Sequence, residues 1–332
     1  MYIPPLGSTV ERMLAARAIS ADPDNPLEAL QVGEVDPRPA PEGWVPVTIR
    51  AAALNQHDVW TLRGVGMPAE RLPITLGCDG AGVTDDGREV IVHAVIPTPG
   101  WGGVETEDPK REILSEIHDG TLAERVWVPE RNLVAKPTAL SFEEAACLPV
   151  AWLTAFSMLG KARLSPGDTV LVQGAGGGVS TAAVPLAKAL GYRVWVTSRD
   201  EQRRHAAVEL GADEAFESGA RLPERVDAVL ESVGRATWSH SIRSLRPGGS
   251  VVTCGATTGE PEQTELTRIF FQQLRVIGST MGTREDLEAL AALCVTSGVR
   301  PTIDSVRPLS EARDAFARLV AGDSFGKLVL VP

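Results

Sequence analysis

A glycine-rich turn is the stretch of this sequence whose residue types and spacing point most directly to chemistry. It separates a β-branched run, Thr169 to Gln173, from a small apolar run, Val179 to Leu190, and we expect these runs to form a strand and a helix. Glycine lets the backbone approach a pyrophosphate closely, and free N–H groups and the positive end of the helix dipole then meet its charge. The residues predicted to bind a dinucleotide here are Gly174, Ala175, Gly176, Gly177, Gly178 and Val179.

The tip of the next expected strand, Arg193 to Thr197, indicates which dinucleotide is bound. NAD enzymes carry an acid there for the ribose 2′-hydroxyl, whereas NADP enzymes avoid the acid and offer arginine. The acid position falls on a serine, and the groups that a 2′-phosphate would meet are Ser198, Arg199, Arg203 and Arg204. We therefore predict NADPH as the cofactor. The alternative is that these arginines form only a solvated helix face, paired with neighbouring acids.

A second group of polar side chains follows the expected strand Val47 to Ala53. Asn55, His57 and Asp58 stand directly after it, and strand ends are common places for functional groups. His57 is a candidate proton donor because imidazole titrates near neutral pH. A surface histidine turned away from the site is equally compatible with the sequence, and water admitted to the site is the other possible donor.

The pattern of expected strands and helices differs between the two halves of the chain. Before residue 150, short strands and turns are dense, which indicates a β-rich domain. Beyond it, strands and helices alternate, which indicates a parallel doubly wound sheet and an α/β fold class. The strands expected in that sheet are Thr169–Gln173, Arg193–Thr197, Glu214–Phe216, Val226–Leu230, Ser250–Cys254 and Leu274–Thr280. Two helices, about Arg284–Thr296 and Ser310–Ala321, and a last strand, Lys327–Val331, are expected to return to the first domain.

Composition excludes several classes of partner. The net charge of −11 argues against nucleic acids and anionic membranes, because both need clustered lysine and arginine. The longest uncharged run, Ala145 to Gly160, is too short to cross a bilayer, and we expect it to be a buried helix joining two domains. The segment Met1 to Leu14 lacks the apolar core of a signal peptide. No Cys-x-x-Cys pair is present, which is typical of reduced thiols in a cytoplasmic protein; the cysteines are Cys78, Cys147, Cys254 and Cys294.

Eight segments, in order along the chain, give the sequence from about Met13 to Pro332 a family resemblance. It resembles the medium-chain dehydrogenase/reductase superfamily and is similar to its quinone oxidoreductase and zinc-type alcohol dehydrogenase-like branches. The resemblance implies a GroES-like catalytic domain, residues 1–148 and 285–332, a Rossmann domain, residues 149–284, and a cleft between them for hydride transfer. The matching segments are Ala51–Asp58, Leu76–Val83, Asp119–Glu124, Ala146–Ala155, Gly174–Thr181, Glu231–Gly234, Ile277–Thr283 and Phe325–Leu330.

The resemblance also identifies where zinc-dependent members bind their metal. The three ligand positions fall on Asn55, Cys78 and the neighbourhood of Val150–Ala151, and only Cys78 among them is a good zinc ligand. The structural zinc of the family needs four close cysteines in roughly the Pro97–Asp119 region, which has none. We therefore predict an enzyme without metal, although His57, Asp58 and Asp79 lie nearby in sequence.

Further roles in the cleft are implied by the same resemblance. Asn55 and Asp58 match the polar pair that zinc-free members keep near the nicotinamide, and Thr154 matches a threonine that packs against its ring. Val233 and Gly255 complete the implied cofactor contacts. Without a metal to stabilise charge on a carbonyl oxygen, the protein should prefer small-molecule substrates that delocalise the charge, namely quinones and α,β-unsaturated carbonyls.

Two alternative functions stay open at this point. The first is a zinc-free carbonyl or alcohol oxidoreductase whose oxyanion rests on Asn55 or Thr154. The second is a non-catalytic NADPH-binding protein similar to zeta-crystallin-like relatives. A panel of quinones, enones and aldehydes separates these functions, because only an enzyme consumes NADPH.

The last strand of the doubly wound sheet bears on assembly. Leu274–Thr280 comes last in the second half of the sheet and should lie at its edge. An apolar edge strand must be covered, and in the resembled family two such edges pair across a two-fold axis. We therefore predict a homodimer with Val276 near the interface.

Overall fold

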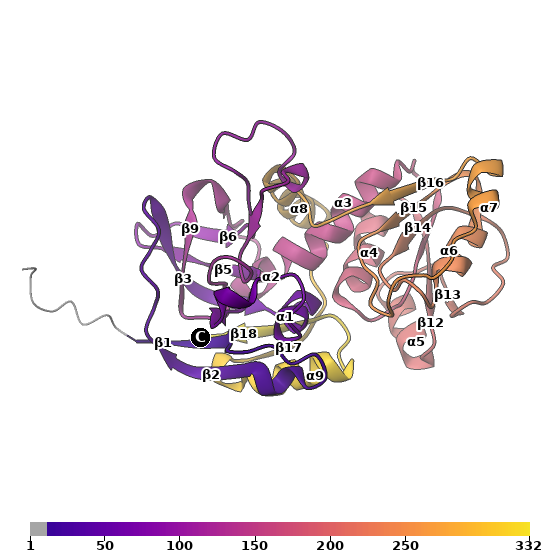
Figure 1. Cartoon of the computed structure of the whole chain (residues 1–332). Coiled ribbons are helices and arrows are strands. Elements are labelled where there is room, and N and C mark those ends of the chain that lie inside the picture. The colour runs from indigo at the N-terminus through magenta and orange to yellow at the C-terminus, as the bar shows by residue number, and fades with distance from the viewer. Residues whose placement is uncertain (1–11) are drawn as a thin grey trace, which may run out of the picture.

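The computed structural model describes residues 12–332, which form two lobes (Figure 1). The lobe on the left of Figure 1 holds the N-terminal strands together with the yellow C-terminal segment, and the lobe on the right holds the middle of the chain. This confirms the predicted α/β class, with a β-rich lobe beside a parallel sheet. Residues 1–11 of the segment Met1 to Leu14 lie outside the described part of the chain.

The β-rich lobe is built around the long strand β3 (Trp44–Ala53). This strand pairs antiparallel with β5 (Asp79–Thr84) and with β18 (Lys327–Val331), so the end of the chain returns to the first lobe as predicted. The sheet is completed by β6 (Glu89–Val92), β9 (Arg125–Pro129), β10 (Leu133–Ala135) and β17 (Ile303–Pro308). Smaller sheets contain β1 (Met13–Ala18), β2 (Leu30–Val35) and β4 (Ile74–Thr75), and β7 (Val95–Ile96) with β8 (Glu112–Ile113).

The second lobe contains a six-stranded parallel sheet in the order β13-β12-β11-β14-β15-β16. The strands are β11 (Thr169–Val172), β12 (Arg193–Ser198), β13 (Glu214–Glu217), β14 (Val226–Glu231), β15 (Leu245–Thr253) and β16 (Arg275–Gly278). Every predicted strand of this sheet is present, and the order is that of a doubly wound nucleotide-binding fold. Its helices are α4 (Gly178–Ala189), α5 (Glu201–Glu209), α6 (Trp238–Ser244) and α7 (Leu266–Phe271).

The junction between the lobes differs from the single helix expected over Ala145 to Gly160. Helix α2 (Phe142–Ala146) is followed by a π-helical turn, Leu148–Trp152, and then by α3 (Leu153–Ala162). Pro149 lies in that turn, and because proline has no N–H group it cannot continue an α-helical ladder. Trp152 is fully buried in a core that includes residues of both lobes, such as Ala81 and Val170.

The remaining helices are α1 (Gln56–Leu62), α8 (Arg284–Ser297) and α9 (Ala312–Ala321), and the last two match the helices predicted there. Single 3-10 turns occupy Pro26–Ala29, Ala69–Arg71, Glu105–Glu107, Glu130–Asn132 and Leu309–Glu311. Within residues 12–332, every helix is too short or too polar to cross a membrane.

Strand β16 lies at one end of the parallel sheet, as predicted for the last strand. Val276 in this strand is 47% exposed, and Phe271 at the end of α7 is 72% exposed. An apolar sheet edge therefore faces solvent in the single chain.

Candidate active site

Asn55 lies at the point where β3 ends and α1 begins, and it is only 7% exposed. Its Oδ1 accepts a hydrogen bond of 2.7 Å from the Nζ of Lys327, and its Nδ2 donates one of 2.9 Å to Asp79. An ammonium can only donate and an ionised carboxylate oxygen can only accept, so these two partners fix the orientation of the amide.

Lys327 and Asp79 form a buried ion pair beside this amide. Their Nζ and Oδ2 atoms are 2.8 Å apart, and the side chains are 2% and 0% exposed. The ammonium also donates to the carbonyl oxygen of Leu54 at 2.6 Å, and the second oxygen of Asp79 accepts from the N–H of Val150 at 2.8 Å. Burial raises the pKa of Asp79, and the attraction of Lys327 acts against that shift. We call Asn55, Asp79 and Lys327 the Lys327 cluster.

The Lys327 cluster bears on whether zinc fits the site. Asn55 itself stands at one of the three zinc-ligand positions, and Asp79 accepts a hydrogen bond from the backbone N–H of Val150 at another. Cys78 is therefore the one residue at these positions with a good metal-binding side chain. A buried ammonium at this place repels a cation, and burial raises the pKa of the Cys78 thiol above its ordinary value. Over residues 12–332, no three histidine, cysteine or acidic side chains are grouped as metal ligands. The residues present do not fit a catalytic zinc.

His57 is held between an acid and a thiol. Its Nε2 donates to Glu116 at 2.7 Å, and its Nδ1 is 3.5 Å from the Sγ of Cys78. The thiol proton is donated to the carbonyl oxygen of Leu114, so the sulfur meets Nδ1 as an acceptor. Burial lowers the pKa of His57, but the interactions with Cys78 and Glu116 outweigh it and raise the pKa well above its ordinary value. The imidazole is 27% exposed and Glu116 is 21% exposed, so the pair reaches solvent.

Asp58 and Thr154, two further predicted site residues, lie near Asn55 and Asp79 respectively and are both buried. Asp58 is completely buried, and its two oxygens accept from the N–H groups of Asn55 at 2.8 Å and Gly77 at 2.9 Å. These bonds fix the entry into α1. Thr154 is 6% exposed in the first turn of α3, four residues after Val150, so it lies one helical turn from the contact with Asp79.

The glycine turn, which is the predicted cofactor-binding segment, lies against the Lys327 cluster. Gly174 has φ +77° and Gly176 has φ +111°, which side-chain-bearing residues rarely adopt. A Cβ at Gly174 would come within 2.7 Å of Val233, which places Val233 directly on the turn. At the first residue of α4, a Cβ on Gly178 would lie 3.1 Å from Ala151 and 3.4 Å from the Lys327 stem. The turn and the N-terminus of α4 form a cradle that fits a dinucleotide phosphate.

Some of the residues predicted to contact the 2′-phosphate of NADPH form hydrogen bonds with other parts of the protein. Ser198 ends β12, and its hydroxyl accepts from the N–H of Asp200 at 3.2 Å. Arg199 beside it is exposed. Arg204 donates to the Ser198 carbonyl at 2.9 Å, and Arg203 donates to carbonyl oxygens of Gly322 and Ser324 in the other lobe. Gly255 follows β15 two residues after its end.

Two functional residues, Lys327 and Glu116, are absent from the sequence prediction. The sequence places Lys327 in an expected strand and in the family-matching segment Phe325–Leu330 without a role, whereas its side chain pairs with Asn55 across 272 residues. Glu116 lies in the loose acidic segment Pro97–Asp119 and pairs with His57 across 59 residues. A lysine opening an otherwise apolar strand that becomes buried is the one local signal that could have identified Lys327.

Comparison with known proteins places the chain in a family. Residues 41–138 match the family described as "Alcohol dehydrogenase GroES-like domain", and residues 178–296 match "Zinc-binding dehydrogenase". The acryloyl-coenzyme A reductase of Metallosphaera sedula is 31% identical over 326 residues, which cover 91% of this chain and 96% of that protein. The chain belongs to the medium-chain dehydrogenase/reductase superfamily.

Two further comparisons relate this medium-chain dehydrogenase/reductase to known members. The 2-methylene-furan-3-one reductase of Solanum lycopersicum is 32% identical over 88% of this chain and 72% of that protein. A crystal structure of an NAD-dependent alcohol dehydrogenase is 34% identical, superposes with a TM-score of 0.88, and covers 96% of this chain and 100% of its own. The predicted family is thus confirmed, and the protein is an oxidoreductase of that type.

Proposed function

We propose that the protein is a cytoplasmic, NADPH-dependent reductase of quinones or α,β-unsaturated carbonyl compounds that works without zinc. The observation that carries this proposal is the Lys327 cluster, which fills the metal position with an ammonium, an amide and a carboxylate. The relatives support the substrate class, because an acryloyl thioester and a methylene-furanone both carry a carbon–carbon double bond conjugated to a carbonyl.

The roles we assign follow from the positions of the residues. The turn from Gly174 to Gly178 and the N-terminus of α4 hold the pyrophosphate, while Ser198 and Arg199 receive the 2′-phosphate. When bound, NADPH supplies a hydride from its nicotinamide. Thr154 and the Lys327 cluster border the nicotinamide end, where the buried ammonium orients the Asn55 amide. Asp58 positions this segment through its two backbone hydrogen bonds.

His57 supplies the proton that completes the reduction in this proposal. Both ring nitrogens face acceptors, Glu116 and Cys78, so the imidazole is held in its charged form and has a proton to give. Glu116 keeps that charge stable and, being partly exposed, connects the ring with solvent for reprotonation. If water were the donor instead, removing either side chain would leave the pH dependence of reduction unchanged.

Glu116→Gln is expected to move the alkaline limit of reduction to lower pH. A donor with a raised pKa is protonated below that pKa, and activity is lost as pH rises through it. Removing the Glu116 carboxylate takes away an interaction that raises the pKa of His57, so the loss should begin at lower pH. The measurement is kcat/KM against pH for both proteins; Glu112→Gln, which removes a carboxylate paired with His118 instead, is the control. Superimposable profiles would refute the assignment of His57.

The purified protein is expected to hold no stoichiometric zinc and to keep its activity in a strong chelator. The reason is that the ligand positions offer a carboxamide, one protonated thiol and no third ligand, while a tetrahedral catalytic site needs three N, S or O ligands. Elemental analysis after gel filtration is the measurement. A content of about one zinc per chain would contradict the proposal.

Val276→Pro is expected to convert a homodimer into monomers. Proline removes an N–H donor from the exposed edge strand β16, where we propose that two copies pair antiparallel across a two-fold axis. Light scattering should give about twice 35.3 kDa for the wild type and 35.3 kDa for the variant, with nucleotide binding retained as evidence of folding. A wild-type mass of 35.3 kDa at micromolar concentration would rule the dimer out.

A carbonyl or alcohol oxidoreductase is the second candidate, favoured by the likeness to an NAD-dependent alcohol dehydrogenase. Cofactor consumption should be measured with matched pairs, such as an enone and its saturated ketone. The proposed function requires turnover of the conjugated member of each pair. Turnover of the saturated member alone favours the second candidate, and binding of NADPH without any turnover favours a non-catalytic protein.

A further inference from the structure

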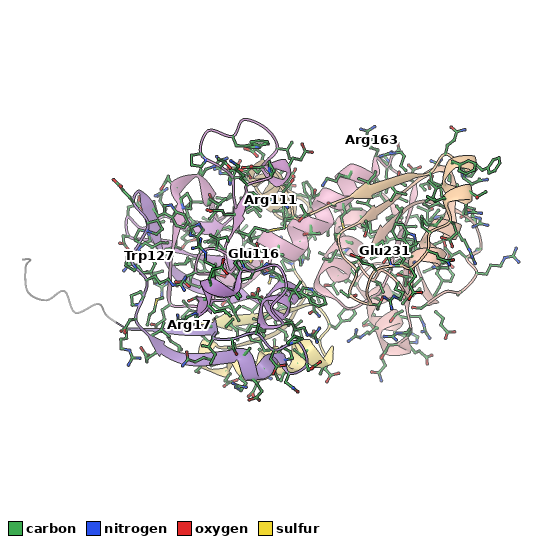
Figure 2. The ribbon with its side chains drawn as sticks, in the orientation of Figure 1. Arg17, Arg111, Glu116, Trp127, Arg163 and Glu231 are labelled. Carbon is green, nitrogen blue, oxygen red and sulfur yellow. The ribbon has the colours of Figure 1, made fainter. Side chains whose placement is uncertain are left out.

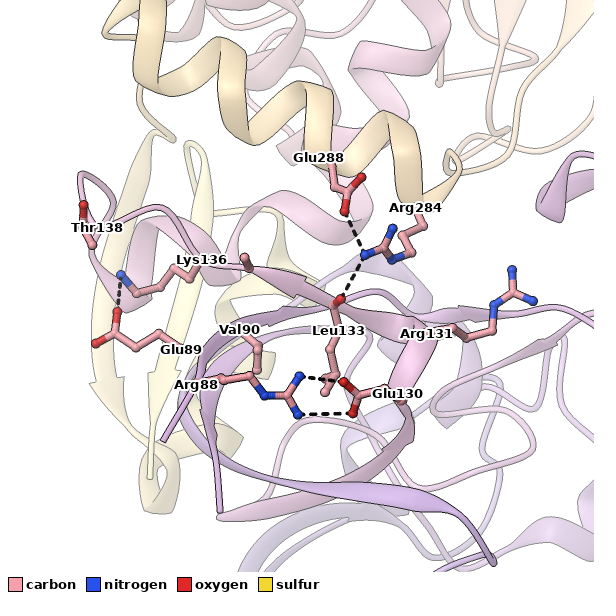
Figure 3. A pocket seen from close by; sticks show the side chains of 11 residues that line it. Arg88, Glu89, Val90, Glu130, Arg131, Leu133, Lys136, Thr138, Arg284 and Glu288 are labelled. Carbon is pink, nitrogen blue, oxygen red and sulfur yellow. Dashed lines mark hydrogen bonds and ion pairs between the residues drawn. The ribbon is translucent and has the colours of Figure 1, made fainter. Parts of the chain in front are cut away.

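Two cavities outside the proposed active site can be compared by their charges. The larger, about 680 Å³, lies between β6, β10 and α8. Figure 3 shows Arg88, Lys136 and Arg284 paired with acids that line the same cavity, namely Glu130, Glu89 and Glu288. Its fourth cation, Arg131, binds Glu105. A cavity neutralised in this way offers no charge to a ligand.

The second cavity, about 490 Å³, is lined by more positive than negative side chains. It lies between the segment Gly219–Arg225 and helix α6, and its charged side chains are Arg221, Arg225, Arg243 and Glu224. The single acid of the lining is already bound by Arg193, which stands outside the cavity. Arg243 has a partner, Glu265, at 3.4 Å. In the part of the chain that the structure describes, Arg221 and Arg225 have no acidic partner within 4.0 Å.

Positive charge is crowded at this place in a protein whose net charge is −11. Arg268 of α7 donates to the carbonyl oxygens of Ile242 and Arg243 and so lies against the end of α6. Burial lowers the pKa of Arg268, and repulsion from Arg225 and Arg243 lowers it further. Four guanidinium groups thus share a region that contains too few carboxylates, a situation that binding of an anion relieves.

The wall of this cavity is fixed from inside the lobe. His240 accepts from Gln173 Nε2 at Nδ1, 2.9 Å away, so its proton lies on Nε2 and is donated to the carbonyl oxygen of Ala220 at 2.9 Å. Gln173 directly precedes the glycine turn and also bonds Thr197 at the end of β12. The segment that carries Arg221 is therefore tied to the buried framework of the sheet, and the cavity is preformed.

Arg225 lies away from the predicted nucleotide contact at the other end of β14. Arg225 immediately precedes β14, whereas Val233 comes after its carboxyl end. Six residues of strand separate the two ends of β14 by about 20 Å. Dinucleotides bind at the carboxyl ends of such strands, so Arg225, at the amino end of β14, is not part of that site.

We propose that the cavity between Gly219–Arg225 and α6 is a second ligand site, which binds the phosphate group of a small organic phosphate through Arg221, Arg225 and Arg243. Guanidinium groups bind phosphate oxygens in pairs of parallel hydrogen bonds, and the cavity volume exceeds that of one phosphate, which leaves room for an organic body. This site is independent of which hydride acceptor the enzyme uses.

Calorimetric titration with inorganic pyrophosphate tests the site. The enzyme is first saturated with whichever of NADPH and NADH it binds more tightly, which blocks the glycine turn. One binding event per chain is expected, weakened about tenfold or more by Arg225→Gln and also by Arg221→Gln. Arg88→Gln, which removes the same charge from the neutralised cavity, should leave it unchanged.

Each other outcome counts against the proposal. Absence of binding, equal binding by the arginine variants, or binding of pyrophosphate only to the enzyme free of nucleotide would overturn it, the last by assigning the anion to the cofactor site. Both arginines are exposed, so the variants should fold, and unchanged nucleotide affinity verifies this. If one variant fails to fold, the other still decides the question.

Discussion

Lys327→Met is expected to lower the free energy of unfolding by about 3–5 kcal/mol, the usual effect of removing one partner of a buried ion pair. The methionine keeps the length of the side chain but leaves Asp79 buried without its cation and Asn55 Oδ1 without its donor. Denaturant unfolding followed by fluorescence measures the change. A variant as stable as the wild type would show that the buried ion pair of the Lys327 cluster does not stabilise the fold.

The double variant Lys327→Met/Asp79→Asn separates charge from packing. A neutral amide at position 79 no longer needs a cation, and it can still accept from the N–H of Val150. The Asn55 amide, released from Lys327, can turn to pair with it. We therefore expect part of the lost stability to return, because replacing both members of a buried pair costs less than replacing one. Additive losses would contradict this explanation.

Arg199→Asp is expected to weaken NADPH binding by about 1.5–3 kcal/mol, a ten- to hundredfold change in Kd, with little effect on NADH. The substitution removes a cation beside Ser198 and places an acid where NAD enzymes carry one. Fluorescence titration of both nucleotides gives the ratio of affinities.

Arg163→Asp provides the matched control for this change. Arg163 is also exposed on the second lobe, but it ends α3 away from the tip of β12 (Figure 2). It should leave both affinities unaltered, which excludes a general effect of charge. Equal affinity of the wild type for NADPH and NADH would count against the cofactor assignment.

The parallel sheet could be predicted from the sequence because its central strands β11, β12 and β14 are short apolar runs that are almost entirely buried. β11 is buried at every residue and was located to within one residue. Strand β17 has no predicted counterpart because its sequence, Ile-Asp-Ser-Val-Arg-Pro, contains no apolar run. The π-helical turn was also missed, because an uncharged run with one proline does not reveal how the backbone passes it.

The candidate site was predictable where chemistry is local in sequence. The glycine turn and the residues after β3 stand in continuous segments with recognisable types. The partners that define their state do not, since Lys327 and Glu116 reach the site from elements brought there by sheet pairing and loop packing. Asp58 illustrates the limit, because its sequence position does not reveal that both oxygens bind backbone amides.

The position of the transferred hydride tests the central claim most directly. Enzyme treated with a chelator is supplied with NADPH carrying deuterium at C4 and with an enone, and the product is examined by NMR. The account predicts deuterium on the β-carbon of a saturated ketone, because without a Lewis acid the charge must be delocalised through the conjugated system. Deuterium on the carbonyl carbon of an allylic alcohol, or activity that appears only after zinc is added, would contradict it.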